Sequence, residues 1–216
     1  MEIVSGRGAI KKINAMSKYG LISETDGQTL EKVMDLVCKE FTDVNFLEVG
    51  IYAGTTGQGM VDYFTEKGVP SWWTGIDNNR DGQEVHYEPD NFIHGNSNEV
   101  YNEVPDDSQH IVLIDACHCF SAVISDFFCY APKVKVGCYL MFHDSGKHID
   151  TLHGWQGIGD KNDPDMCLGG VRKALKTIFG EYLDNNGEYG KGWKLVFDIA
   201  DPNDAAGGFC CFQKLY

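Results

Sequence analysis

The sequence predicts an α/β protein with a doubly wound, mostly parallel sheet that ends in an antiparallel hairpin. Short apolar segments of strand type alternate with helical segments along the chain, and this order produces parallel strands joined by crossover helices. The last two apolar segments, residues 193–199 and 208–214, are joined by a connection too short to hold a crossover helix. They are therefore expected to pair with each other antiparallel.

Helical periodicity marks four segments of the chain. In each of them apolar residues recur at the spacing that places them on one side of a helix. The segments are residues 29–41, the stretch after the glycine-containing turn 50–54, residues 121–130 and residues 170–179. Thr55 or Thr56 is the expected N-cap of the second helix, because a hydroxyl can accept a hydrogen bond from the free N–H groups of the first turn.

Strands and domain limits follow from the remaining pattern. Short apolar runs predict strands over residues 45–49, 72–76, 91–94, 110–114 and 137–143. Residues 1–28 have weak periodicity and are expected to form a lead-in that covers the active site. Residues 29–216 are expected to form a single domain. Within it, the glycine- and Asp-rich segment 145–169 follows a strand end and is expected to act as a mobile lid.

Composition excludes several classes of function. The 216-residue chain has a formal net charge of -14, and phosphate binding needs clustered Lys and Arg, so nucleic acid is a poor partner. No apolar run reaches the length of a membrane span, and the first twenty residues lack the apolar core of a signal peptide, so we expect a cytoplasmic protein without a membrane partner. The eight cysteines show no Cys-x-x-Cys spacing, which argues against structural zinc. A homo-oligomer is compatible with this composition.

Two strand ends suggest a nucleoside site, because ligands of open α/β sheets bind beyond the carboxyl ends of the strands. Gly50 and Gly54 follow the first strand and let the backbone approach a ligand closely. The spacing differs from the G-x-G-x-x-G pattern of dinucleotide enzymes. Asp77 ends the second strand, where a carboxylate can accept hydrogen bonds from both hydroxyls of a ribose. A glycine-rich turn without a ligand is the alternative interpretation.

The segment Glu48-Val49-Gly50-Ile51-Tyr52-Ala53-Gly54 resembles motif I of the methyltransferases, in which an acidic residue and glycines hold the methionine part of S-adenosylmethionine (SAM). The resemblance implies a Rossmann-like class I methyltransferase fold with SAM as cofactor. It also implies a set of cofactor-binding residues at the strand ends: Glu48, Gly50, Tyr52, Gly54, Thr55, Asp77, Asn78, Asn96, Ser97, Asp115 and Ala116.

Carboxylates end two neighbouring predicted strands. Asp115 follows one strand and Asp144 follows the next, so both are expected at the same edge of the sheet, with His143 beside them. Carboxylate oxygens suit Mg²⁺, and an imidazole shifts the preference toward ions such as Mn²⁺. A divalent metal held by Asp115, His143 and Asp144 would lower the pKa of a substrate hydroxyl.

The stretch from Leu113 to Asp126, followed by residues 137–144, resembles the small-molecule methyltransferases that include macrocin O-methyltransferase and the cephalosporin hydroxylase-like proteins. Their pattern reads roughly I-D-G-x-H-x-Y, a V-x-x-D helix, then G-G-x-x-x-x-H-D, and the likeness spans about residues 44–180. The chain departs from it at Ala116, Phe120 and Val136-Gly137. A more distant similarity to catechol O-methyltransferase implies catalytic roles for Asp115 and for His118, with His118 as the general base. In the resembled families, the metal-ligand position that His143 takes usually holds a carboxylate.

These features predict SAM-dependent, metal-assisted O-methylation of a small hydroxylated molecule, such as a sugar or a phenol. Two alternatives stay open on the sequence. One is a nucleotide-binding oxidoreductase, which would require a glycine pattern that the chain lacks. The other is a non-catalytic accessory protein that keeps the SAM-binding fold.

Overall fold

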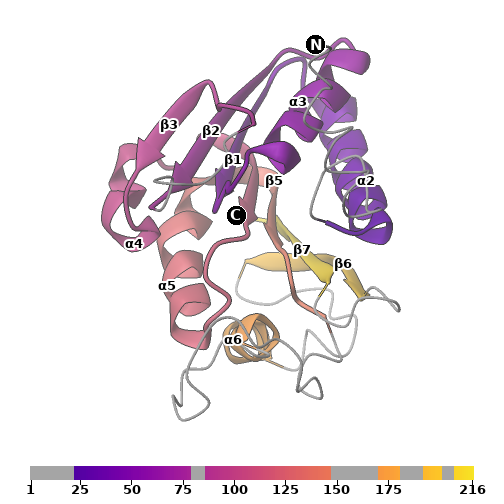
Figure 1. Ribbon diagram of the computed structural model, residues 1–216. Helices are drawn as coiled ribbons and strands as arrows, with labels where there is room; N and C mark the ends of the chain where they lie inside the picture. Colours follow the sequence, from indigo (N-terminus) through magenta and orange to yellow (C-terminus); the bar gives the residue numbers. More distant parts are fainter. Residues whose placement is uncertain (1–21, 79–85, 147–169, 181–191, 201–206) are drawn as a thin grey trace.

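The computed structural model describes residues 22–78, 86–146, 170–180, 192–200 and 207–216. Residues 1–21 of the expected lead-in, and residues 147–169 of the expected lid, lie outside the described residues. The described segments form a central sheet with helices on both of its faces (Figure 1).

The sheet has seven strands in the order β3-β2-β1-β4-β5-β7-β6. Strands β1 to β5 are parallel, whereas β7 runs antiparallel to both β5 and β6. The strands are β1 Val44–Val49, β2 Ser71–Asp77, β3 Asn91–His94, β4 Gln109–Ile114, β5 Val134–Phe142, β6 Trp193–Ala200 and β7 Gly208–Lys214. The order confirms the predicted fold class, a Rossmann-like sheet that ends in an antiparallel hairpin.

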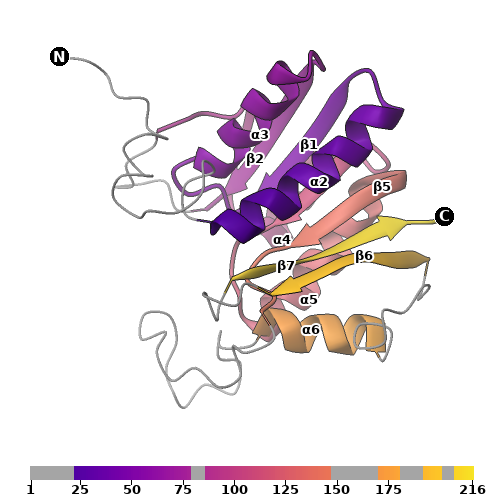
Figure 2. The ribbon, with the colours of Figure 1, turned by 90° about the vertical axis from the view of Figure 1, so that its right-hand side faces the viewer.

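Helices cover both faces of the sheet. Helices α2 (Glu24–Glu40) and α3 (Thr55–Glu66) lie on one face, and α4 (Ser97–Val100), α5 (Phe120–Tyr130) and α6 (Gly170–Phe179) lie on the other (Figures 1 and 2). Single 3₁₀ turns follow α4 at Tyr101–Glu103 and α5 at Ala131–Lys133. The crossovers from β1 to β2, from β3 to β4 and from β4 to β5 therefore place α3, α4 and α5 against the sheet, as the alternating sequence pattern predicts.

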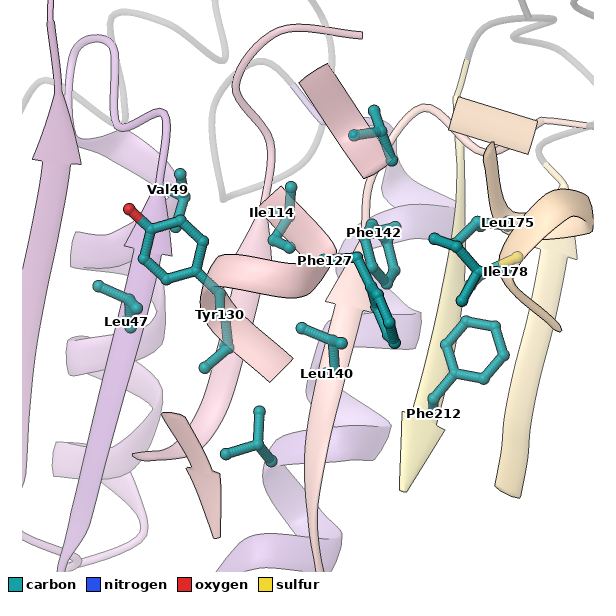
Figure 3. Packing of buried hydrophobic residues seen from close by; sticks show 14 of the residues in the cluster. Leu47, Val49, Ile114, Phe127, Tyr130, Leu140, Phe142, Leu175, Ile178 and Phe212 are labelled. Carbon is teal, nitrogen blue, oxygen red and sulfur yellow. The ribbon is translucent and has the colours of Figure 1, made fainter. Parts of the chain in front are cut away.

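Two buried apolar clusters hold the layers together, one on each face of the sheet. Because side chains alternate along a strand, β1 contributes Leu47 and Val49 to the cluster under α5 and α6, and Phe46 to the cluster under α2 and α3. Figure 3 shows part of the first cluster, in which Phe127 of α5 lies beside Phe142 of β5 and Phe212 of β7 lies beside Ile178 of α6. The two-sided burial explains why the central strands read as nearly continuous apolar runs.

Two predicted helix starts are wrong, for different physical reasons. Helix α2 begins at Glu24, not at residue 29, because Ser23 is its N-cap and accepts a hydrogen bond from the Asp26 backbone N–H over 3.1 Å. Helix α3 has Gly54 as its N-cap, in a left-handed conformation with φ of 77° and without a side-chain cap, so neither Thr55 nor Thr56 has that role.

The structure adds elements that periodicity did not reveal. Helix α4 has only four residues, too few to show a repeat, and β5 begins at Val134, three residues earlier than predicted. None of the helices in the described part of the chain combines the length and the apolar character needed to span a membrane.

Candidate active site

The carboxyl ends of β1, β2, β4 and β5 meet at one edge of the sheet, and this edge collects the residues singled out in the sequence. Backbone hydrogen bonds continue past the strand ends and keep them in register. The Gly50 N–H donates to the Ile76 carbonyl at 2.8 Å, and the Asp115 N–H donates to the Val49 carbonyl at 2.8 Å. The His143 N–H donates to the Ile114 carbonyl at 3.1 Å.

The turn after β1 is shaped by glycine. Gly50 has φ of 88°, and a Cβ atom added to it would collide with the backbone of Asp115 and Ala116. Tyr52 also has a positive φ, 44°, which is strained for a residue with a side chain, and its ring is 54% exposed. The turn therefore presents its backbone at the sheet edge, directly beside the end of β4.

Asp77 braces this turn. Its Oδ2 accepts hydrogen bonds from the backbone N–H groups of Ile51, at 3.1 Å, and Tyr52, at 3.0 Å. Both N–H groups belong to the turn rather than to a ladder between strands, so the carboxylate at the end of β2 fixes the conformation of the turn after β1. The sequence predicts a ribose contact for Asp77, but it gives no sign of these two hydrogen bonds to the turn.

Glu48 is buried under α3, with 1% of its surface exposed. A Cβ atom on Gly57 would strike the Glu48 carboxylate and the ring of Trp73, so the absence of a side chain at Gly57 makes room for both. Burial, and then the nearby charge of Asp115, raise the pKa of Glu48 well above its usual range, while contacts with the Gly57 backbone and Trp73 lower it less. Glu48 thus lies beneath the turn, in the packing between β1 and α3.

The far side of the edge, beyond β2 and β3, holds the remaining predicted cofactor residues. Exposed Asn78 donates to the Oδ1 of Asn96 at 2.6 Å, which links the ends of these two strands. Ser97 points in a different direction, because its hydroxyl donates to the Oδ1 of buried Asp126 at 2.6 Å. Asn78 and Asn96 therefore line the edge, whereas the Ser97 side chain anchors α4 to α5.

Three side chains converge between the ends of β4 and β5. His118 Nε2 lies 3.4 Å from Asp115 Oδ1 and 3.3 Å from Asp144 Oδ2. Burial lowers the pKa of His118, but Asp115 and Asp144 raise it more, so the net shift is upward. For Asp115 burial raises the pKa, yet His143 and His118 lower it further, so this carboxyl is held ionised below its usual range.

Asp26 joins this group from α2, although the sequence placed it in the lead-in. His143 Nδ1 lies 3.1 Å from Asp115 Oδ1, and His143 Nε2 lies 3.4 Å from Asp26 Oδ2. Burial lowers the pKa of His143, but the charges of Asp115 and Asp144 and the bonds to Asp115 and Asp26 raise it well above its usual range. No apolar periodicity involves Asp26, and the signal that could have found it was the capping residue Ser23 three positions earlier.

One set of side chains within the described residues has the spacing of a metal site. Ligand atoms of Asp115, His118 and Asp144 all lie within 4.8 Å of one another. Two carboxylates and one imidazole form a donor set that suits Mg²⁺ or Mn²⁺, so these residues fit such an ion. The sequence placed His143 in the set instead of His118; here both nitrogens of His143 face carboxylates, of Asp115 and Asp26.

Comparison with known proteins supports the resemblance to the methyltransferases. Residues 47–145, from β1 to just beyond β5, match the family model described as a methyltransferase domain. This match, together with the strand order of the sheet, is consistent with a class I methyltransferase. The matched residues include the Gly50 turn, Asp77 and the four residues Asp115, His118, His143 and Asp144, but not Asp26.

Solved structures of methyltransferases share the fold. O-methyltransferase TomG from Streptomyces achromogenes, in complex with SAM, has a TM-score of 0.62 at 13% identity, with 100% of this chain and 91% of TomG covered. An O-methyltransferase from Bacillus cereus, in complex with S-adenosylhomocysteine (SAH), has a TM-score of 0.61 at 12% identity, with 99% and 93% covered. At this identity the likeness establishes the fold alone.

MycE, a methyltransferase of mycinamycin biosynthesis solved with Mg and SAH, has a TM-score of 0.55 at 17% identity. The match covers 97% of this chain and 54% of MycE, so the chain spans about half the length of that enzyme. No curated protein matches the sequence significantly.

Asp126, the buried carboxylate that holds α4 through Ser97, gives a prediction about how stability depends on pH. Burial raises the pKa of Asp126 to about 6, and its Oδ2 has no hydrogen-bond partner among the described residues. A raised pKa means that the stability contributed by the protonated form is present below pH 4 and is lost as the pH rises through about 6. Asp126→Asn removes this titration while keeping an acceptor for Ser97. We therefore expect the variant to gain about 2–3 kcal/mol in unfolding free energy relative to wild type between pH 4 and pH 8.

Urea unfolding of the two proteins at pH 4, 6 and 8 measures this difference. The exposed Glu103→Gln is the control, since it removes a carboxylate without altering a buried one. A difference between Asp126→Asn and wild type that does not vary with pH would contradict the assignment.

Proposed function

We propose that this chain transfers the methyl group of SAM to a hydroxyl oxygen of a small molecule. The observation that carries the proposal is the convergence of Asp115, His118 and Asp144 at the sheet edge, immediately beside the Gly50 turn. The turn and the end of β2 supply groups for the nucleoside, and the cluster supplies groups for the acceptor. The solved neighbours in complex with SAM or SAH, together with the matched methyltransferase model, support SAM as the methyl donor.

On the cofactor side, the exposed backbone of the Gly50 turn lies next to Asp77, and the linked pair Asn78 and Asn96 lies beyond it. We assign the methionine part of SAM to the turn, the ribose to Asp77 and the adenine to the Asn96 side. Because Asp77 also holds the turn through two N–H groups, loss of its carboxylate would damage two contacts with the cofactor at once.

On the acceptor side, His118 is placed to receive the proton of the hydroxyl. The hydroxyl oxygen forms a bond to the methyl carbon while the carbon–sulfur bond of SAM breaks, and the electron pair of that bond stays on the sulfur of SAH. The proton passes to Nε2 of His118, where Asp115 and Asp144 stabilise the imidazolium. General base catalysis of this kind contributes about 10²–10⁴-fold to a rate.

The proposal also includes a divalent metal that assists the transfer. Asp115 and Asp144 would hold it through carboxylate oxygens, and when bound it would lower the pKa of the acceptor hydroxyl. The Nε2 lone pair of His118 can bind the metal or accept the proton, but not both in one step. In the first case His118 completes the metal site, and in the second it is the base.

The cofactor assignment predicts that Asp77→Ala loses most of its affinity for SAH, because both the ribose contact and the brace on the turn disappear. Calorimetric titration with SAH measures the loss, and the exposed Glu66→Ala at the end of α3 is the matched control. Unchanged affinity in Asp77→Ala would refute the ribose assignment.

The acceptor assignment predicts that His118→Ala turns over about 10²–10⁴-fold more slowly while it still binds SAH. SAH release from SAM is measured across a panel of sugars and phenols, with and without Mn²⁺ and with Asp144→Ala in parallel. If Mn²⁺ binds wild type and His118→Ala equally, His118 is the base, and if only wild type binds it, His118 is a ligand. Tight SAH binding without transfer to any acceptor would favour the accessory role over an enzyme.

A further inference from the structure

Asp26 is a buried carboxylate whose side chain faces His143, at the carboxyl end of β5. It lies in the first turn of α2 and is 0% exposed. Its Oδ2 faces His143 Nε2 at 3.4 Å, and its Oδ1 has no hydrogen-bond partner among the described residues. A buried carboxylate is costly unless it is paired. The contact with His143 is therefore the interaction that offsets the burial of Asp26.

His143 is held on three sides. Its Nε2 faces Asp26, its Nδ1 faces Asp115 at 3.1 Å, and its ring packs against Phe209 of β7 with centroids 4.8 Å apart. Asp144 Oδ1 lies 3.6 Å from the same Nδ1. Since both ring nitrogens face carboxylates, rotation of the ring would break a contact at each end.

Asp115 is the next member of the chain of contacts. The same Oδ1 that faces His143 Nδ1 lies 3.4 Å from His118 Nε2, so one oxygen of Asp115 joins the two imidazoles. A shift of the His143 ring would therefore change the position of this oxygen relative to His118. The contacts run without a break from α2, through the ends of β5 and β4, to the proposed base.

We propose that Asp26 is a positioning residue: through His143 it orients the Asp115 carboxylate toward His118. Helix α2 thus contributes to the active site as well as to the core. The functional meaning of this role rests on the proposed function, because Asp115 and His118 are the groups that would act on the acceptor. The contact chain itself is independent of SAM, metal and acceptor.

The test compares Asp26→Asn with wild type by NMR of protein with ¹⁵N-labelled histidine. The ring ¹⁵N signals of His143 and His118 are followed, and the variants His143→Gln and His118→Gln assign them. Asp26→Asn keeps the shape of the side chain but removes its charge. Thr29→Val is the matched control for stability, since buried Thr29 bonds to the Thr25 carbonyl in the same helix. Glu24→Gln is the matched control for charge, because exposed Glu24 lies in the same first turn.

We expect Asp26→Asn to move the ring signals of both His143 and His118, while SAH affinity by calorimetry is retained and both controls leave the ring signals in place. Unchanged His118 signals would overturn the proposal, even if those of His143 move, because the orientation would then not reach the base. Equal changes in Thr29→Val would also overturn it, since they would indicate a general effect of loosening α2. A wild-type protein that does not bind SAH would refute the proposed function but not this contact chain.

Discussion

Gly50 lies so close to the backbone of Asp115 that no side chain fits between them. This contact joins the turn after β1 to the end of β4, and the proposed cofactor and acceptor groups lie on its two sides. It depends on the parallel register, in which Val49 pairs with Ile114 and the Asp115 N–H donates to the Val49 carbonyl. In the proposed function, this contact would place the methyl donor beside the acceptor without a long side chain between them.

The edge also concentrates charge. Asp26, Asp115 and Asp144 contribute three carboxylates, and His118 and His143 lie between them. Each imidazole has a raised pKa because of these carboxylates, and Asp115 has a lowered one for the reciprocal reason. The imidazoles offset repulsion that would otherwise oppose folding, and a divalent cation could take over part of that role.

Much of this architecture could be predicted from the sequence, because apolar runs and helical stripes report burial directly. Strand ends could be predicted too, so Asp77, Asp115 and Asp144 were expected at one edge. The contact of Asp26 with His143 could not be predicted, since the two residues are 117 positions apart in the chain. Ser23 could have marked the start of the helix, but a helix cap does not reveal the partner of a buried acid in the first turn. The direction of a side chain was equally hidden: Ser97 points to Asp126 and Glu48 lies under α3, which no spacing in the sequence indicates.

The central claim is that the edge beside Gly50 binds the nucleoside of SAM. Calorimetric titration of the wild-type protein with SAH, and in parallel with NADH, tests it most directly. The account predicts saturable binding of SAH with a dissociation constant in the micromolar range and no heat from NADH. Binding of NADH without binding of SAH would contradict it and would favour a dinucleotide enzyme on the same sheet.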